Sequence, residues 1–389
     1  MAKERLHAQA ELSRLRGQVE YLKHIAVQGG RYGEKTLHEP ELESFGIEGI
    51  AQYIKDNDCK KIVVMCGAGI STSAGIPDFR TPGTGLYDNL QKYDLPEPQA
   101  VFTLDYFRHS PEAFYTLADE MWPDSFSPTP VHHFIAELHQ RGMLLRCYTQ
   151  NIDSLESRAG LPASKIVAAH GNFDSASSIG TLDESGQVVP GSRRPVPVQE
   201  VRDAITNGAD SMNGWPALAR KYGSLVKPDI TFFGEALPGR FFELREADLA
   251  QCELLIIMGT SLHVAPFNGL IHKVMPNTPR LLINREAVGG PQNVLVEVGL
   301  GQIDSTDLDF RQGFNYRDAF FQGSCDDGVR ALAAELGWGE HVLSERMRAG
   351  LASRSQKPVS KPMGKPTMAV HGMGPPSLKR SRTWGDQED

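Results

Sequence analysis

Six short apolar runs constrain the fold of this 389-residue chain more than any other feature. They are rich in branched side chains, most of them end in Gly, Asn or Ser, and helix-like stretches separate them. The runs lie at residues 62–65, 144–148, 166–169, 230–233, 254–258 and 281–283. Apolar strands that alternate with helices predict a parallel sheet covered on both faces. We therefore expect an α/β fold, a doubly wound Rossmann-like parallel sheet.

Two stretches interrupt this alternation, and we expect them to form a smaller inserted lobe. Residues 73–135 are aromatic-rich and mostly helical after a long loop, whereas residues 172–222 have little periodicity and many Gly and Pro. The large lobe would then comprise the three remaining parts of a domain at 37–342, namely 37–72, 136–171 and 223–342.

The two ends of the chain differ from this domain. Residues 1–36 predict a helical extension with a short heptad seam. The seam consists of Leu12, Leu15, Val19, Leu22 and Ala26. Such a helix either packs on its own domain or pairs two chains in a homo-oligomer, and both readings stay open. Residues 343–389 are basic and Pro-rich with few apolar side chains, which predicts a disordered tail.

Charge and cysteine usage restrict the class of protein. A formal net charge of −8 gives no broad basic face, so we expect no direct nucleic-acid partner. Apolar runs are too short for a membrane span, and acidic residues interrupt the first segment, against a secretory signal. The five cysteines are scattered, as in reduced intracellular proteins. We expect a cytoplasmic location, with the nucleus as the second choice.

The stretch CGAGISTSAGIPDFR at 66–80 follows the first predicted strand. Gly67 and Gly69 permit a tight turn whose backbone N–H groups approach a pyrophosphate, and a following helix would point its positive end at the same anion. Thr72 stands where the dinucleotide fingerprint needs a third glycine. Phe79 can cover a reactive centre and Arg80 can reach a phosphate. The pattern as a whole favours a nucleotide-binding turn.

Polar side chains also follow the second and third predicted strands. Gln150, Asn151 and Asp153 can hold ribose hydroxyls and a carboxamide. His170 comes directly after the third strand, and ligands bind at the carboxyl ends of parallel strands. This position favours a functional imidazole over a structural one.

Together these motifs resemble the sirtuin family of NAD-dependent protein deacylases over roughly residues 38–341. The resemblance is carried by GAGIS at 67–71, GIPDFR at 75–80, TQNID at 149–153, HG at 170–171, KPDITFFGE at 227–235, GTSL at 259–262 and INRE at 283–286. GTGLYD at 83–88 is most similar to the eukaryotic class that includes cytosolic tubulin deacylases. The implied cofactor is NAD, and the implied partners are acylated-lysine proteins or peptides, with tubulin and histone as candidates.

The resemblance also implies site residues. The NAD-binding residues would be Gly67, Ala68, Gly69, Ser71, Asp78, Phe79, Arg80, Gln150, Asn151, Ile152, Asp153, Gly259, Thr260, Ser261, Asn284, Arg285, Glu286 and Cys325. His170 and Asn151 would be catalytic, with His170 as the general base on a ribose hydroxyl. The products would be free lysine, nicotinamide and O-acyl-ADP-ribose.

The acylated peptide would bind as an added strand between the lobes. Its contacts would be Val226, Phe233, Gly234, Glu235, Leu262, His263 and Val264. Adjacent strand residues face opposite ways, so we expect one of Phe232 and Phe233 to pack in the core.

One departure from the family pattern concerns metal. Sirtuins usually hold a structural zinc with four cysteines between the His-Gly and Lys-Pro-Asp motifs, but residues 171–227 contain neither cysteine nor histidine. Hydroxyls and scattered carboxylates are poor zinc ligands, so we predict no zinc and no other metal. Either Trp215, Leu218 and Tyr222 replace the metal by packing, or the lobe is loose and catalysis weak. Mono-ADP-ribosyl transfer and a weakly catalytic NAD- or peptide-binding scaffold remain alternative functions.

Overall fold

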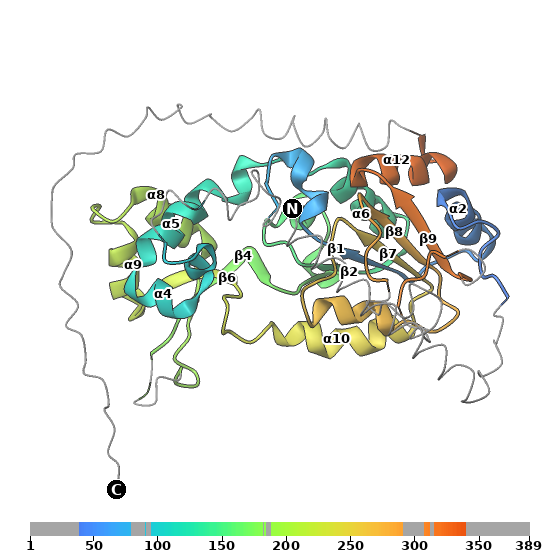
Figure 1. Ribbon diagram of the computed structural model, residues 1–389. Helices are drawn as coiled ribbons and strands as arrows, with labels where there is room; N and C mark the ends of the chain where they lie inside the picture. The colour runs from blue at the N-terminus through green and yellow to red at the C-terminus, as the bar shows by residue number, and fades with distance from the viewer. Residues whose placement is uncertain are drawn as a thin grey trace, which may run out of the picture.

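The computed structural model describes residues 39–78, 90, 95–181, 183, 188–290, 307–311 and 315–339. The expected N-terminal extension and C-terminal tail lie outside these residues, as do Phe79, Arg80 and the stretch at 83–88. The described residues form two sheets, one of six parallel strands and one of three antiparallel strands (Figure 1). No helix among them combines the length and the apolar character needed to span a bilayer.

The six-stranded sheet has the strand order β3-β2-β1-β7-β8-β9. Its strands are β1 (Ile62–Cys66), β2 (Leu144–Thr149), β3 (Ile166–Ala168), β7 (Leu254–Met258), β8 (Arg280–Asn284) and β9 (Asp318–Gln322). Counted along the chain within this sheet, the order is that of the doubly wound Rossmann fold. The strand order reverses between β1 and β7, and a crevice for ligands opens at such a reversal. The predicted fold class is confirmed, although β9 was not among the predicted runs.

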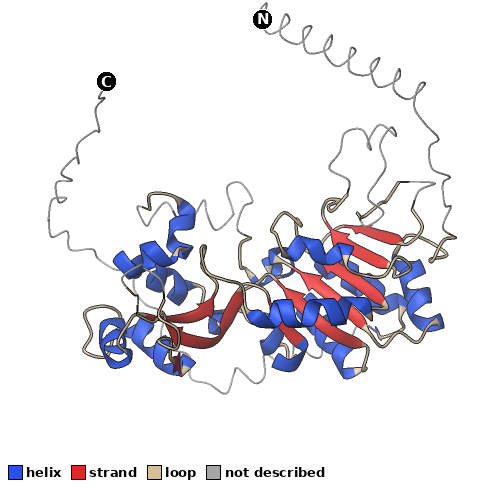
Figure 2. Ribbon diagram, turned by 90° about the horizontal axis from the view of Figure 1, so that it is seen from below, coloured by secondary structure: helices blue, strands red, loops and turns tan. Residues whose placement is uncertain are grey.

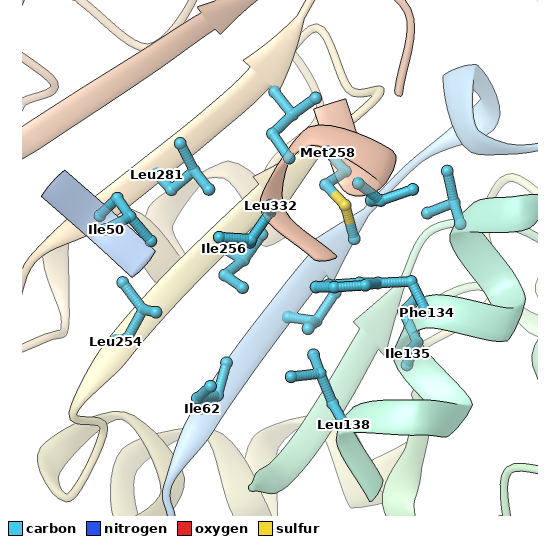
Figure 3. Close-up of a cluster of buried hydrophobic side chains, with 14 of the residues drawn as sticks. Ile50, Ile62, Phe134, Ile135, Leu138, Leu254, Ile256, Met258, Leu281 and Leu332 are labelled. Carbon is cyan, nitrogen blue, oxygen red and sulfur yellow. The ribbon is translucent and has the colours of Figure 1, made fainter. Parts of the chain in front are cut away.

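Helices cover both faces of this sheet (Figures 1 and 2). Helices α2 (Ile47–Asp56), α6 (Pro130–Gln140) and α12 (Cys325–Glu335) pack on one face, whereas α10 (Gly239–Ala250) and η7 (Phe267–His272) pack on the other. Alternate residues of β1 and β7 enter the two apolar clusters, and Figure 3 shows one of them, with Ile62 and Ile256 facing Leu138 and Leu332. Burial on both faces is why these strands read as continuous apolar runs.

The small lobe is built on the three-stranded sheet, with the order β5-β4-β6. Its strands are β4 (Gly171–Ser178), β5 (Pro195–Val196) and β6 (Val226–Ile230), and its helices are α4 (Leu104–His109), α5 (Pro111–Glu120), α8 (Val198–Asn207) and α9 (Trp215–Tyr222). Shorter segments of this lobe are η4 (Pro98–Phe102) and η5 (Pro123–Ser125), whereas α7 (Leu155–Arg158) and η6 (Ala163–Lys165) connect β2 and β3 of the large sheet.

The apolar run at 230–233 does not behave as predicted. We expected a strand of the large parallel sheet, but the strand is β6, which ends at Ile230 and pairs antiparallel with β4. Beyond it, Phe232 is 1% exposed and its ring lies 4.9 Å from that of Phe114, whereas Phe233 is 55% exposed. The expectation for the parallel sheet is therefore wrong, and the expectation that one phenylalanine packs in the core is confirmed.

Candidate active site

The turn after β1 packs directly against the turn after β7. The backbone N–H of Gly69 donates to the carbonyl oxygen of Gly259 over 2.8 Å, and a Cβ at Gly69 would lie 2.6 Å from the Cα of Gly259. Gly259 itself has a φ of 58°, which favours glycine. These two glycines are therefore required for the close approach of the two turns at the point where the strand order reverses.

The segment that follows the Gly67 turn is not the helix we expected. It forms two three-residue 3₁₀ helices, η1 (Ala68–Ile70) and η2 (Thr72–Ala74). Gly75 closes η2 with a φ of 88°. Segments this short align too few peptide dipoles to act as a helix N-terminus, so an anion here would depend on individual backbone N–H groups.

A chain of hydrogen bonds joins the end of β1 to the end of β2. The Asn151 amide Nδ2 donates to Ser71 Oγ over 3.1 Å, and Ser71 Oγ donates to Asp153 Oδ2 over 2.6 Å. All three side chains are buried. The Asn151 backbone N–H donates to Thr149 Oγ1, which fixes the loop that carries the amide. The structure thus brings together Ser71, Asn151 and Asp153.

His170 follows β3 and is held by the same loop. Its Nδ1 lies 3.0 Å from the Gln150 carbonyl oxygen, which can only accept, so the neutral ring carries its hydrogen on Nδ1 and leaves Nε2 as an acceptor. Burial lowers the pKa of His170 despite this hydrogen bond, so the ring is neutral at physiological pH. The Gln150 side chain in turn accepts from Thr260 Oγ1 over 2.7 Å. A neutral, half-buried imidazole with one basic nitrogen suits a proton acceptor.

The ends of β7 and β8 continue the same edge. The Asn284 Nδ2 lies 3.4 Å from the Thr260 carbonyl oxygen and donates to that of Glu286 over 2.9 Å. Cys325 opens α12 beside them, with its Sγ 3.6 Å from the Ile283 carbonyl oxygen. Burial raises the pKa of Cys325 to about 12, so this thiol is neutral. Other predicted residues of this edge, Ser261, Arg285 and Glu286, are exposed.

The predicted peptide contacts fall into two groups. Exposed or half-buried residues are Phe233, Gly234, Glu235, His263 and Val264, and Leu262 is buried with a φ of 54°. Val226 differs from them because it is completely buried, and its carbonyl oxygen accepts from the Tyr115 hydroxyl over 2.6 Å. We therefore assign Val226 to the core of the small lobe rather than to a peptide cleft.

Glu235 is the centre of a charged cluster beside the predicted peptide contacts. Its carboxylate lies 3.0 Å from Lys227 Nζ and 2.5 Å from Arg193 Nη2, and it accepts from the Phe232 backbone N–H over 2.9 Å. Burial by itself would raise the pKa of Glu235, but Lys227 and these hydrogen bonds hold it below its usual value. The ionised carboxylate therefore fixes the turn at 232–235 and ties it to Arg193 in the segment that precedes β5.

Sequence reasoning missed three buried polar residues beneath this edge: Thr149, Glu156 and His132. Glu156 lies on α7, three residues after Asp153, and His132 lies on the buried α6. Among the described residues, two groups of at least three potential metal ligands lie close together: Cys66 with Cys147 and Glu156, and His132 with Asp153 and Glu156. Neither includes a small-lobe residue. The sequence signal that could have revealed His132 was the polar pair His132-His133 inside a largely apolar helix.

Comparison with known proteins agrees with this geometry. The Sir2 family model matches residues 67–266. The chain belongs to the Sir2 family. It is 44% identical over 332 residues to the NAD-dependent protein deacetylase sirtuin-2 of Danio rerio, covering 85% of this chain and 81% of that one. It is 40% identical over 306 residues to the NAD-dependent protein deacetylase sirtuin-3 of Mus musculus, covering 79% and 80%.

A fungal relative extends this range of organisms. The NAD-dependent protein deacetylase hst2 of Schizosaccharomyces pombe is 40% identical over 296 residues, covering 76% of this chain and 78% of that one. The Sir2 match begins at Gly67, in the turn that packs on Gly259, and includes the Asn151–Ser71–Asp153 chain and His170. The matched range therefore contains the residues that the fold gathers at the ends of β1, β2 and β3.

Proposed function

We propose that this Sir2 protein removes acyl groups from protein lysines at the expense of NAD, with His170 as general base and Asn151 holding the ribose. Membership of the family and the names of its relatives make it an NAD-dependent protein deacetylase. The observation that supports these residue roles best is the geometry of His170, whose Nδ1 is engaged by Gln150 and whose Nε2 is basic, beside the Asn151–Ser71–Asp153 chain.

Each side chain has a separate part in this mechanism. When bound, NAD would supply an electrophilic sugar carbon for the acyl oxygen, with nicotinamide as the leaving group. His170 Nε2 would accept the proton of a ribose hydroxyl as the general base. Asn151, fixed by Ser71, orients the sugar, and Asp153 with Ile152 faces the carboxamide. Gln150 connects His170 to Thr260, so it links the loop after β2 to the ends of β3 and β7.

The remaining cofactor contacts follow the same edge of the sheet. We assign the pyrophosphate to the turn at 67–71 with Arg80, the shielding of the sugar to Phe79, and the adenosine half to Ser261, Asn284–Glu286 and Cys325. Their support is the family match and the placement of the described members around the β1–β7 reversal point. Asp78 begins the cofactor loop in this assignment.

Replacing the general base tests the mechanism. His170→Tyr should lower NAD-dependent deacetylation of an acetyl-lysine peptide at least ~100-fold, because general-base catalysis contributes about 10²–10⁴-fold. His109→Tyr, which changes an exposed histidine on α4, is the matched control and should keep full activity. Both variants should show the thermal unfolding midpoint of the unaltered protein. Near-normal turnover by the His170 variant would refute the assignment, and product mass spectrometry would reveal ADP-ribosyl transfer instead.

We also propose that the small lobe functions without zinc. Residues 171–227 offer no thiolate and no imidazole, the donors on which structural zinc sites depend. In their place lies an apolar cluster that includes Leu218 and Val201, with Trp215 and Tyr222 packed against it. The Trp215 and Tyr115 rings stack with centroids 5.0 Å apart. Elemental analysis should find no metal, and one stoichiometric zinc per chain would overturn the proposal.

The substrate is an extended acylated peptide bound between the two lobes. The exposed Phe233 and the turn at 233–235 offer one edge, and the segment 262–264 offers the other. Recognition through backbone hydrogen bonds tolerates many sequences, so tubulin and histone peptides are both suitable probes. We place the protein in the cytoplasm, with the nucleus as second choice. A peptide panel measured with purified protein separates these substrates.

A further inference from the structure

A buried pair of carboxyl groups lies beneath the proposed ribose site, and the mechanism above uses only one of them. Asp153 belongs to the hydrogen-bonded chain, whereas Glu156 is 2% exposed and has no role so far. A ring nitrogen of His132, a carboxylate oxygen of Asp153 and one of Glu156 all lie within 4.8 Å of one another. Two negative charges so close together and out of water would repel each other strongly.

No cation compensates for these charges among the described residues that surround Glu156. The titratable groups that face it are Asp153 on its own loop, Cys66 on β1, Cys147 on β2, His132 on α6 and, farther away, Asp174 on β4. Cys66 Sγ lies 3.8 Å from a Glu156 carboxyl oxygen. Burial raises the pKa values of both Cys66 and Cys147, so the thiols add no charge of their own at neutral pH.

His132 supplies a hydrogen-bond donor and no charge. Its Nδ1 accepts from the Thr129 backbone N–H over 3.1 Å, so the neutral ring carries its hydrogen on Nε2. That Nε2 is buried and has no hydrogen-bond partner among the described residues. Burial, with a contribution from His133, lowers the pKa of His132 to about 3. The ring that carries this unpaired buried N–H lies beside the two carboxyl groups, and a neutral donor suits a pair that holds a single negative charge.

The two carboxyl groups differ in the donors that they receive. Asp153 accepts from Ser71 Oγ over 2.6 Å and from the Leu155 backbone N–H over 3.0 Å, which suits the ionised form. Glu156 receives a hydrogen bond from Thr149, but burial and then the charge of Asp153 raise its pKa to about 8. Burial also raises the pKa of Asp153, so the pair titrates as a unit.

We propose that Glu156 and His132 are positioning residues of the deacetylation reaction: Glu156 keeps its proton and His132 keeps its Nε2 hydrogen, so the buried cluster holds one negative charge, on Asp153. That charge takes the only hydroxyl hydrogen of Ser71. Ser71 Oγ must then accept from Asn151, which fixes the amide that faces the ribose. The inference rests on the proposed role of Asn151, but the charge state of the cluster can be measured independently of activity.

The sign of the pH dependence follows from the proton on Glu156. The folded protein holds this proton up to about pH 8, whereas an unfolded glutamate loses it near its ordinary value of 4.5. The folded state therefore binds more protons between these values, and the contribution of Glu156 to stability falls as pH rises through this window. Above it, both carboxylates are charged, and the order of Ser71 and Asn151 is lost.

Glu156→Gln tests the proposal because the amide copies the shape and the donor of a protonated glutamate. At pH 7 its NAD-dependent deacetylation rate should stay within about three-fold of the unaltered protein, and the loss of activity above pH 8 should be reduced. The variant should have the higher thermal midpoint. Its advantage over the unaltered protein should be about 3–5 °C larger at pH 8 than at pH 5.5. Asp153→Asn should instead lose activity at least ~100-fold.

Opposite results would overturn the proposal. A folded Glu156→Gln protein with a 50-fold lower rate at pH 7 would show that the reaction needs an ionised Glu156. Identical pH dependences of the two thermal midpoints would show that Glu156 holds no proton. If the Gln variant fails to fold, a ¹³C magnetic resonance titration of the Glu156 carboxyl in the unaltered protein decides the same point. A midpoint below pH 6 refutes the proposal, whether or not the protein proves active.

Discussion

The edge of the large sheet and the small lobe hold their shapes by different means. At the edge, two turns meet backbone to backbone, with Gly69 and Gly259 in contact and room for no side chain. In the small lobe, β4 has buried, half-buried and exposed residues without strict alternation, and order comes from side chains such as Leu218 and Trp215 on α9, which belong to or pack against an apolar cluster with residues of α5 and α8. Backbone contacts permit no substitution, whereas side-chain packing can be rebuilt from other residues.

This difference explains how the small lobe remains folded without thiolate ligands. The aromatic rings of Tyr115 and Trp215 stack, and those of Trp122 and Phe173 meet edge to face at 4.9 Å. Arg202 lies over the Trp122 ring at 5.1 Å. Many apolar and aromatic contacts thus hold the described part of the small lobe together.

The largest expected effect is at the backbone contact of the large lobe. Gly69→Ala places a methyl group 2.6 Å from the Gly259 Cα, which must separate the two turns and distort the proposed pyrophosphate site. We expect at least ~100-fold weaker NAD binding by calorimetry, in line with the loss of several positioned contacts. Gly269→Ala is the control, because a Cβ there meets nothing within 4 Å. Unchanged NAD affinity in the Gly69 variant would show that this contact does not shape the site.

Removing apolar volume from the small lobe should cost less and act elsewhere. Leu218→Ala should lower the free energy of unfolding by about 3 kcal/mol, because a buried leucine leaves a cavity. Urea unfolding measures this loss, and NAD binding by calorimetry should change little. Met212→Ala, at a side chain that is 90% exposed, should stay within about 0.5 kcal/mol. A loss below about 1 kcal/mol for Leu218→Ala would mean that packing does not hold this lobe.

A smaller effect is expected at the Arg193–Glu235 ion pair, beside the predicted peptide contacts. Arg193→Gln removes one partner of Glu235 and loosens the turn that carries Phe233. Since an exposed ion pair contributes up to about 1 kcal/mol, KM for an acetyl-lysine peptide should rise about three- to five-fold while kcat and the NAD affinity stay unchanged. Arg194→Gln, at the exposed neighbouring position, is the matched control. Equal effects of both variants would speak for general charge attraction rather than positioning.

The smallest expected effect is that of chelators. Incubation with excess EDTA or 1,10-phenanthroline should leave the thermal midpoint and the deacetylation rate unchanged, because residues 171–227 contain no cysteine or histidine to release a zinc ion. Differential scanning calorimetry and a peptide assay provide the two readouts. A loss of activity that added zinc restores would show that the small lobe depends on a metal ion after all.

Much of the chemistry was predictable because it depends on local sequence. A parallel strand buried on both faces is an apolar run, and a ligand edge places small and polar residues directly after it, as at Gly67, Asn151 and His170. These signals predicted the fold class and the composition of the edge. The missing thiols of the small lobe were also visible, because a metal site needs particular atoms.

The tertiary structure alone decided which strands pair and which buried polar groups lie together. An apolar run is compatible with either sheet, so only packing showed that β6 pairs with β4 and that Val226 belongs to the core. His132 and Glu156 lie on separate helices, and nothing near either residue in the sequence indicates the other. Burial and proximity arise from contacts between distant segments, and the charge on a buried carboxyl depends on both.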